Sequence, residues 1–280
     1  MYPQPRRFVP DRPVFVEGSL MFADRPLAKP FVYGGTTPAG APDETATYQP
    51  RIVKIEQGRG AVAQASLDVE GFALAQHRSV IDNFWDEAET SGRGYVEAAD
   101  IVQQLTGAAR VVTFDHIVRK RAATGSNADQ SATRQPATRV HVDYTETSGP
   151  KRVGDLLGCS TGELSGRRAT IINLWRPVSH PAWDWPLAVC DARTVVPEDL
   201  IATDVRYAER TGEIYYVAHS DAQHWVYVPD LRPDEVLIFK CWDSVSAGAR
   251  FVPHAAFEDV TTSPRAPPRE SVEFRTVALF

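Results

Sequence analysis

Eight short runs rich in Val, Ile, Tyr and Trp fill the C-terminal two-thirds of this 280-residue chain, and Pro, Gly, Asp or Ser bounds each of them. Their lengths match those of β-strands, and turn residues separate them. Such a series predicts a jelly-roll or barrel rather than alternating β–α units. The expected fold class is therefore mainly β, with flanking helices around a jelly-roll core. The runs are residues 111–118, 138–145, 169–178, 187–194, 213–219, 224–230, 235–243 and 271–280.

The N-terminal third is less regular, and we expect the chain to form one domain in three consecutive segments. Residues 1–47 are rich in Pro and Gly and predict an arm laid on the surface. Residues 48–110 predict strand and helical support, and residues 111–280 the jelly-roll core. Within the support we expect a strand at 48–55, a helix around 71–78 capped by Ser66 to Asp68, and a helix from Tyr95 to Leu105 with apolar residues at helical spacing.

Charge and composition exclude several classes of protein. The formal net charge of −6, with no basic run, argues against nucleic acid as a partner. No apolar stretch approaches the roughly 18 residues needed to cross a bilayer, so we expect no membrane contact. Three widely spaced cysteines and an N-terminus without an apolar signal region favour a cytoplasmic protein. Nothing in the composition predicts an oligomeric state.

His141-Val142-Asp143 places an imidazole and a carboxylate two positions apart on an expected strand. Side chains two apart on a strand share one face, so both can bind the same metal ion. His254, 111 residues after Asp143 and soon after an expected strand, is the best candidate for a third ligand. Two histidines and one carboxylate on one triangular face leave three positions open, which suits iron(II). We expect no catalytic residue beyond these ligands.

Two arginines near the C-terminus are candidates for an anion site. Arg269 and Ser271 open the last expected strand, so that a guanidinium and a hydroxyl share one face. A planar bidentate donor is the right partner for the distal carboxylate of 2-oxoglutarate. Arg275 has the same strand parity as Arg269 and is the competing candidate, and the sequence leaves the choice open.

Polar residues interrupt the run at 169–178, where Asn173, Trp175 and Arg176 occur together. Asn173 and Trp175 share one face of this expected strand, and Arg176 points to the other. We predict that this group binds substrate, with either Asn173 or Arg176 holding substrate or co-substrate. Residues 121–137 are polar and strand-free, and predict a mobile loop before His141.

Several segments together resemble the non-haem iron(II)/2-oxoglutarate-dependent hydroxylase/desaturase family of natural-product clusters. They include FDHIVRK, HVDYT, NLWRP, PDEVLIFKCWDS, PHAAFED and APPRESVEFRT. That family includes proteins similar to the cephem 7α-methoxylase small chain, gibberellin-desaturase-like proteins and the aspergillic-acid pathway hydroxylase. The resemblance implies a double-stranded β-helix, iron(II) and 2-oxoglutarate as cofactors, and ascorbate as reductant in vitro. It places the metal ligands at His141, Asp143 and His254, and the 2-oxoglutarate site at Arg269 and Arg275.

The resemblance implies a dioxygenase that uses dioxygen to hydroxylate, desaturate or cyclise a small natural-product or amino-acid-derived substrate. Two alternatives remain open from the sequence. The first is a metal enzyme that does not use 2-oxoglutarate, such as a non-haem iron oxidase or a zinc hydrolase or isomerase. The second is a non-catalytic partner subunit of a biosynthetic enzyme.

Overall fold

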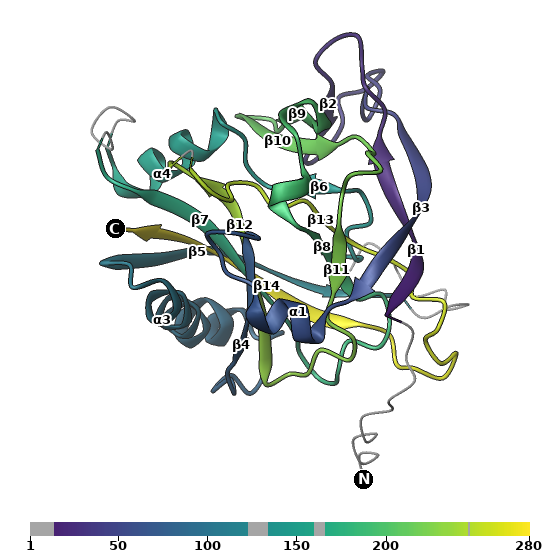
Figure 1. Cartoon of the computed structure of the whole chain (residues 1–280). Coiled ribbons are helices and arrows are strands. Elements are labelled where there is room, and N and C mark those ends of the chain that lie inside the picture. The colour runs from purple at the N-terminus through teal and green to yellow at the C-terminus, as the bar shows by residue number, and fades with distance from the viewer. Residues whose placement is uncertain (1–13, 123–133, 160–165, 246) are drawn as a thin grey trace.

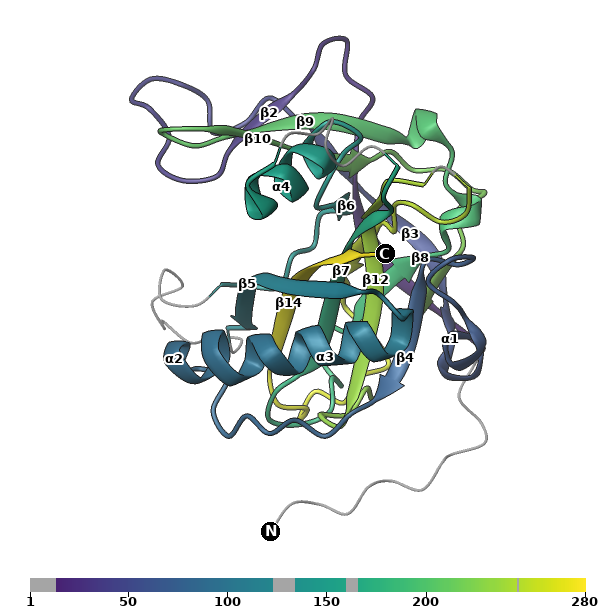
Figure 2. The same ribbon diagram turned by 90° about the vertical axis from the view of Figure 1, so that its left-hand side faces the viewer.

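Two β-sheets form the body of the protein in the computed structural model, which describes residues 14–122, 134–159, 166–245 and 247–280. The nine-stranded sheet has the order β1-β3-β11-β8-β13-β6-β10-β9-β2. The five-stranded sheet has the order β4-β12-β7-β14-β5. Figures 1 and 2 show the two sheets facing one another, with α3 on the outer side of the five-stranded sheet. The expected mainly β fold with a jelly-roll core is confirmed.

The strands of the nine-stranded sheet are β1 (Phe15–Ala23), β2 (Phe31–Tyr33), β3 (Tyr48–Gln57), β6 (His141–Val142), β8 (Leu187–Cys190), β9 (Leu200–Arg206), β10 (Thr211–Val217), β11 (Trp225–Tyr227) and β13 (His254–Ala256). Those of the five-stranded sheet are β4 (Phe72–Gln76), β5 (Arg110–Lys120), β7 (Ala169–Pro177), β12 (Glu235–Asp243) and β14 (Glu270–Leu279). The α-helices are α1 (Arg59–Gln64), α2 (Glu87–Glu89), α3 (Tyr95–Thr106) and α4 (Ser148–Leu157). A π-helix occupies Thr90–Gly94, and 3-10 turns occupy Ala192–Thr194 and Pro197–Asp199.

The main hydrophobic core lies between the two sheets, because each sheet turns alternate side chains inward. Ile171 of β7, Phe239 of β12 and Val277 of β14 contribute to this core and are fully buried. A second core fills the space between the opposite face of the five-stranded sheet and α3, and it includes Ile172 of β7 and Val102 of α3. The odd-numbered residues of β7 and β14 therefore point to the inner face of the five-stranded sheet.

The register of β14 decides which polar groups meet on that inner face, since β14 lies between β5 and β7. Ser271 pairs with Arg119 and Pro177, Glu273 pairs with Ile117 and Trp175, and Arg275 pairs with Asp115 and Asn173. Residues directly opposite one another in an antiparallel pair have neighbouring side chains. A row of charged and amide side chains consequently runs along the inner face toward His141.

Two expectations for the N-terminal third are wrong. Residues 15–23 are not part of a surface arm: they form β1, which pairs along its whole length with β3 and buries Leu20 and Phe22. Residues 72–76 form strand β4 rather than the helix expected around 71–78, because pairing with β12 supplies all their sheet partners. The division of the chain into an arm, a support and a core otherwise stays a prediction. Of the loop expected at 121–137, residues 123–133 lie outside the described residues.

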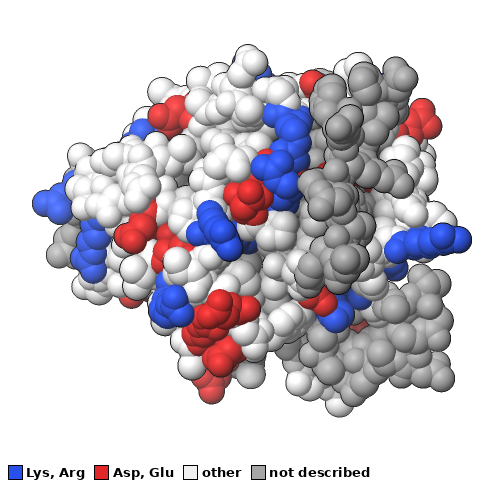
Figure 3. All heavy atoms as spheres, turned by 90° about the horizontal axis from the view of Figure 1, so that it is seen from below, with Lys and Arg blue, Asp and Glu red and all other residues white. Residues whose placement is uncertain are grey.

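The surface seen in Figure 3 carries Lys and Arg side chains interspersed with Asp and Glu side chains. No helix among the described residues is long and apolar enough to cross a membrane. The arginines that concern the site lie inside the molecule, where burial changes their chemistry.

Candidate metal centre

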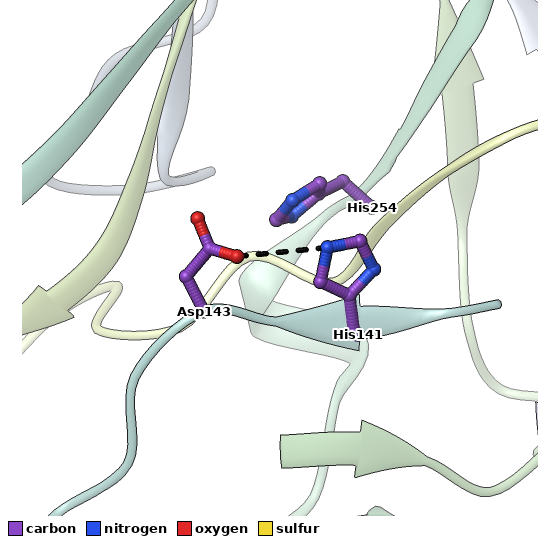
Figure 4. Close-up of side chains that lie close together, drawn as sticks. All are labelled: His141, Asp143 and His254. Carbon is purple, nitrogen blue, oxygen red and sulfur yellow. Dashed lines mark ion pairs between the residues drawn. The ribbon is translucent and has the colours of Figure 1, made fainter. Parts of the chain in front are cut away.

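His141, Asp143 and His254 come together at the inner side of the nine-stranded sheet, as Figure 4 shows. His141 lies on β6 and His254 on β13, and the two residues are direct partners in the antiparallel pair. Asp143 lies one residue beyond the end of β6. One ligand atom from each residue can be chosen so that all three lie within 4.8 Å of one another. The structure thus brings together the three residues that the sequence proposed as ligands.

Backbone carbonyls orient both imidazoles. His141 Nδ1 lies 2.8 Å from the carbonyl oxygen of Arg139, and His254 Nδ1 lies 3.0 Å from that of Val252. A carbonyl oxygen only accepts, so each Nδ1 carries the proton and each Nε2 presents its lone pair. Among the described residues, the buried His254 Nε2 has no hydrogen-bond partner. Metal-binding histidines are held in this way, by a hydrogen bond from the nitrogen that does not bind the metal.

The two oxygens of the Asp143 carboxylate have different surroundings. Oδ2 accepts hydrogen bonds from Asn173 Nδ2 at 2.8 Å and from Arg275 Nε at 3.0 Å. Oδ1 lies 3.6 Å from His141 Nε2 (Figure 4). Both donors to Oδ2 come from the five-stranded sheet, which therefore orients a carboxylate carried by the other sheet. Oδ1 is left for a cation.

Burial and charge give the three groups the protonation states that metal binding needs. Burial lowers the pKa of His141 to about 4, and the neighbouring His254 lowers it further than Asp143 raises it. Burial also lowers the pKa of His254. For Asp143 burial acts in the opposite direction, but the charge of Arg275 and the two histidines hold the pKa of its carboxyl group well below the usual range. At neutral pH the site therefore holds two neutral imidazoles and one carboxylate.

A pocket leads from the two histidines to a buried arginine. Its lining combines polar side chains with apolar ones and consists of Arg119, Ala137, His141, Trp175, Leu187, His254, Ala256, Arg269 and Glu273. A metal ion held by the histidines and the cation of Arg269 would together bind a molecule that carries two anionic groups. A dicarboxylate such as 2-oxoglutarate has this form.

Arg269 is 1% exposed and comes directly before β14. Its main-chain N–H donates to Asp184 Oδ2 at 3.1 Å, and its Nη1 donates to the carbonyl oxygen of Trp185 at 2.6 Å. Trp185 has a φ of 47°, in the left-handed region that non-glycine residues rarely adopt, and such strain is often kept at functional sites. The guanidinium also lies over the Trp175 ring, 5.3 Å from its centroid. Arg269 is thus held by several contacts and aimed into the pocket.

Two buried polar atoms that have no partner within the described chain lie at Arg269 and at Ser271, two residues later in the chain. Among the described residues, Arg269 Nε and Ser271 Oγ are buried and have no hydrogen-bond partner. Leaving such groups unpaired costs roughly 1–3 kcal/mol each. Burial, and then the nearby charge of Arg119, lower the pKa of Arg269 to about 9. A bound anion would relieve both costs.

Arg275 has a different environment. Its Nε, Nη1 and Nη2 donate to Asp143, Asp115 and Glu273 at 3.0, 2.8 and 3.1 Å. All three nitrogen groups of the guanidinium thus have a carboxylate partner. Arg275 orients the ligand group Asp143, and it does not line the pocket.

The three residues expected to bind substrate lie in three places. Asn173 contacts Asp143, and Trp175 lines the pocket. Arg176 lies on the opposite face of β7, where its Nη1 donates to Glu97 at 3.1 Å and its Nη2 to the carbonyl oxygens of His77 and Pro233. The structure therefore does not bring Arg176 to the site.

Arg119 and Glu273 also line the pocket, and neither was expected there from the sequence. Glu273 shares strand parity with Arg269 and Arg275, so the alternation of β14 could have shown it. Arg119 was missed because the expected strand ended at residue 118, whereas β5 continues to Lys120.

An enclosed group of two imidazoles and one carboxylate on a jelly-roll is the arrangement of non-haem iron oxygenases. A family model described as YDMC, oxidoreductase/YMDC permease-like domain, matches residues 20–279. The Fe(II)/2-oxoglutarate-dependent dioxygenase nvfI of Aspergillus novofumigatus is 30% identical over 94% of this chain and 96% of that protein. The hydroxylase/desaturase CTB9 of Cercospora beticola is 32% identical over 97% of this chain and 89% of that protein.

A solved structure agrees. A tryptophan-to-phenylalanine variant of the iron and alpha-ketoglutarate-dependent endoperoxidase NvfI superposes with a TM-score of 0.88 and 27% identity, over 96% of this chain and 98% of that one. The chain belongs to the Fe(II)/2-oxoglutarate-dependent dioxygenase and hydroxylase/desaturase family. The family expected from the sequence is confirmed, and with it a dioxygenase that uses iron(II) and 2-oxoglutarate.

Proposed function

We propose that His141, Asp143 and His254 bind iron(II), and that Arg269 binds the distal carboxylate of 2-oxoglutarate with Ser271 beside it. The observation that carries this proposal is that one pocket is lined both by the two histidines and by the buried Arg269. The donor set fits iron(II): neutral imidazole nitrogens and one carboxylate oxygen suit this ion and leave room for co-substrate and dioxygen. Arg275, the competing candidate, has its guanidinium occupied by three carboxylates.

In this proposal the protein's own residues bind, orient and exclude water. The carbonyl oxygens of Arg139 and Val252 fix the imidazoles, and Asn173 and Arg275 fix the Asp143 carboxylate. The apolar side chains that line the pocket, such as Trp175 and Leu187, would keep water from the co-substrate. Bound iron(II) with 2-oxoglutarate supplies the oxidising chemistry with dioxygen, which side chains cannot supply.

For the reaction we propose hydroxylation, desaturation or ring closure of a small natural-product or amino-acid-derived molecule. The support is the relatives, which are named as hydroxylase/desaturases and as an endoperoxidase. The same relatives favour this function over an iron oxidase without 2-oxoglutarate and over a non-catalytic partner subunit. The cytoplasmic location stays a prediction, which fractionation of cells would test.

Anaerobic reconstitution tests the proposal. Purified protein receives iron(II) and then 2-oxoglutarate, and the visible metal-to-ligand charge-transfer band is followed. We expect the band to appear only with both additions, and succinate and carbon dioxide to form slowly once air and ascorbate are admitted. His254→Ala should give neither the band nor succinate, whereas His116→Ala, a histidine on β5 beside Tyr95, should give both. A wild-type protein that binds iron(II) tightly and turns over substrate without consuming 2-oxoglutarate would contradict the proposal.

A further inference from the structure

A second arginine lies beside Arg269 on the inner face of the five-stranded sheet. Arg119 of β5 is the direct partner of Ser271 on β14, and the main-chain N–H of Arg121 donates to the carbonyl oxygen of Arg269 at 2.9 Å. These two contacts continue the antiparallel register to the end of both strands. Arg119 and Arg269 are therefore diagonal neighbours on one face, a relation in which long side chains reach one another.

Arg269 is buried and Arg119 is half-buried, and both line the pocket. Two neighbouring guanidinium groups in a buried site repel one another, and each loses its hydration there. Burial lowers the pKa of Arg119 as it does that of Arg269. The pairing of the strands does not require two cations at adjacent positions. A bound anion would stabilise this pair of arginines.

Nearby carboxylates act on this pair only from a distance: the charge of Glu273 raises the pKa of both arginines, and Asp184 raises that of Arg269, without an ion pair to either guanidinium. Glu273, which also lines the pocket, accepts its hydrogen bond from Arg275 Nη2. Asp184 accepts from the Arg121 side chain and from the main chain of Arg269, not from the Arg269 guanidinium. In the part of the chain that the structure describes, neither Arg119 nor Arg269 forms a side-chain ion pair with a carboxylate.

We propose that Arg119 and Arg269 together bind the distal carboxylate of 2-oxoglutarate, so that the co-substrate site is a pair of arginines drawn from two adjacent strands. This inference rests on the proposed function and adds a residue to it. Arg119 is already positioned for the role, because its Nη1 donates to the carbonyl oxygen of Gln135 at 2.8 Å. One nitrogen fixes the side chain, and the remaining N–H groups of the guanidinium serve the carboxylate.

A comparison of two ligands and two arginines tests the pair. The first ligand is 2-oxoglutarate, and the second is 2-oxopentanoate, which keeps the keto-acid end and lacks the distal carboxylate. Dissociation constants are measured anaerobically with iron(II) from the charge-transfer band, for wild type, Arg119→Gln, Arg269→Gln and the double variant. We expect Arg119→Gln to weaken 2-oxoglutarate at least about tenfold, since it removes one partner of a buried charge pair. Binding of 2-oxopentanoate should change less than about threefold.

Lys120→Gln is the matched control. Lys120 is the next residue on β5, points to the opposite face and pairs with Glu270 at 2.6 Å. The Lys120→Gln variant loses the same unit of positive charge from the same strand, so its dissociation constant for 2-oxoglutarate should stay near that of wild type. Iron(II) binding by each variant shows that the site is formed. If Arg119→Gln does not bind iron(II), Arg119→Lys replaces it, with the same selective loss expected at smaller size.

Three outcomes would overturn the inference. Equal weakening of both ligands by Arg119→Gln would show that Arg119 supports the pocket without binding the distal carboxylate. A 2-oxoglutarate constant that rises in Arg269→Gln and not in Arg119→Gln would leave the proposed function standing and remove Arg119 from it. Constants unchanged in both single variants and in the double variant would contradict the proposed co-substrate site itself.

Discussion

The two sheets contribute to the site in different ways. The nine-stranded sheet carries the three candidate ligands, on β6, just beyond it, and on β13, and backbone carbonyls two residues before each histidine orient the imidazoles. The five-stranded sheet carries no candidate ligand, but β5, β7 and β14 supply the amide and the arginines that face those ligands. In the proposed site, one sheet thus supplies the metal ligands and the other supplies the charged groups around them.

This comparison separates two kinds of defect. Changes on the nine-stranded sheet should remove the metal ion itself. Changes on the five-stranded sheet should leave a metal ion in place and alter the binding of co-substrate, or weaken the metal ion by a smaller factor. A charged residue on β14 that proved to be a ligand would break the distinction.

The largest expected effect is the loss of a ligand. Replacing His141, Asp143 or His254 singly with Ala should reduce iron(II) affinity by more than the roughly 10- to 100-fold that loss of an outer hydrogen-bond partner costs. Three ligands are the minimum for a facial site, whereas the fold rests on the apolar cores. Bound iron is measured after gel filtration, with circular dichroism to check the fold. Full iron occupancy in any of the three variants would exclude that residue as a ligand.

The next largest effect is expected at Arg269. In Arg269→Gln the distal carboxylate loses its buried charged partner and keeps only Arg119; the loss of one side of a buried charge pair typically costs about 2–5 kcal/mol, or roughly thirty- to several-thousand-fold in affinity. The apparent constant for 2-oxoglutarate should rise by this factor while iron(II) affinity stays unchanged. The apparent constant for 2-oxoglutarate is measured from the rate of succinate formation at varied 2-oxoglutarate concentration.

Arg275→Gln is the paired comparison from the same strand. Because Arg275 contacts Asp143, its loss should weaken iron(II) binding more than it weakens the binding of 2-oxoglutarate. A raised 2-oxoglutarate constant in Arg275→Gln with normal iron(II) binding, and a normal constant in Arg269→Gln, would reverse the assignment of the two arginines.

A smaller effect is expected at Asn173. In Asn173→Ala the Asp143 carboxylate loses a donor at 2.8 Å and keeps the one from Arg275. We expect iron(II) affinity to fall about tenfold, at the low end for an outer-shell partner, while the 2-oxoglutarate constant of the iron-saturated protein stays the same. If that constant rises instead, Asn173 binds the co-substrate directly and its role in orienting Asp143 is secondary.

The smallest effect concerns pH. An exposed two-histidine site would lose iron(II) as pH falls through about 6.5, the ordinary pKa of imidazole. Burial lowers the pKa of His141 to about 4 and lowers that of His254, so protons compete with the metal ion only at lower pH. Iron(II) affinity should therefore be nearly constant from pH 7.5 to 5.5 and decrease below about pH 4.5. A loss of affinity with a midpoint near pH 6.5 would show that the imidazoles are open to water.

The lowered pKa values of the two histidines also make the stability of the folded protein depend on pH, in a direction that can be predicted. The unfolded chain takes up protons on both histidines near pH 6.5, while the folded metal-free protein takes them up only at lower pH. The free energy of unfolding of the metal-free protein should therefore decrease as pH falls from about 6.5 toward 4. Urea unfolding at several pH values, with His141→Gln for comparison, measures this contribution.

Long strands and the local metal motif could be predicted from sequence. The strand expected at 235–243 has the same two boundaries as β12, and the helix expected from Tyr95 to Leu105 corresponds to α3. Strand β4 was misread because Phe-Ala-Leu-Ala-Gln suits a helix in isolation, and only its pairing with β12 makes it a strand. Strand β13 has three residues, too few for any pattern, although it carries His254.

The environment of the site could not be predicted, because it depends on contacts between distant parts of the chain. Parity placed Asn173 on one face of β7, but nothing local shows that this face meets Asp143, 30 residues earlier. The choice between Arg269 and Arg275 depends on the lengths of β5 and β14 and on what lies opposite each residue. Sequence parity shows which residues share a face, and only the register shows which of them meet.

The pairing of His141 with His254 has a consequence for how the protein folds. β6 has only two residues, and its partners β10 and β13 come 70 or more positions later in the chain. Closing such long loops costs entropy before the contacts can repay it, so pairings of this kind tend to form late in folding. A chain emerging from the ribosome cannot assemble the site until residue 254 has been synthesised and β13 has joined the sheet. Binding of a metal ion at this site is therefore expected only when folding is nearly complete, and it does not initiate folding.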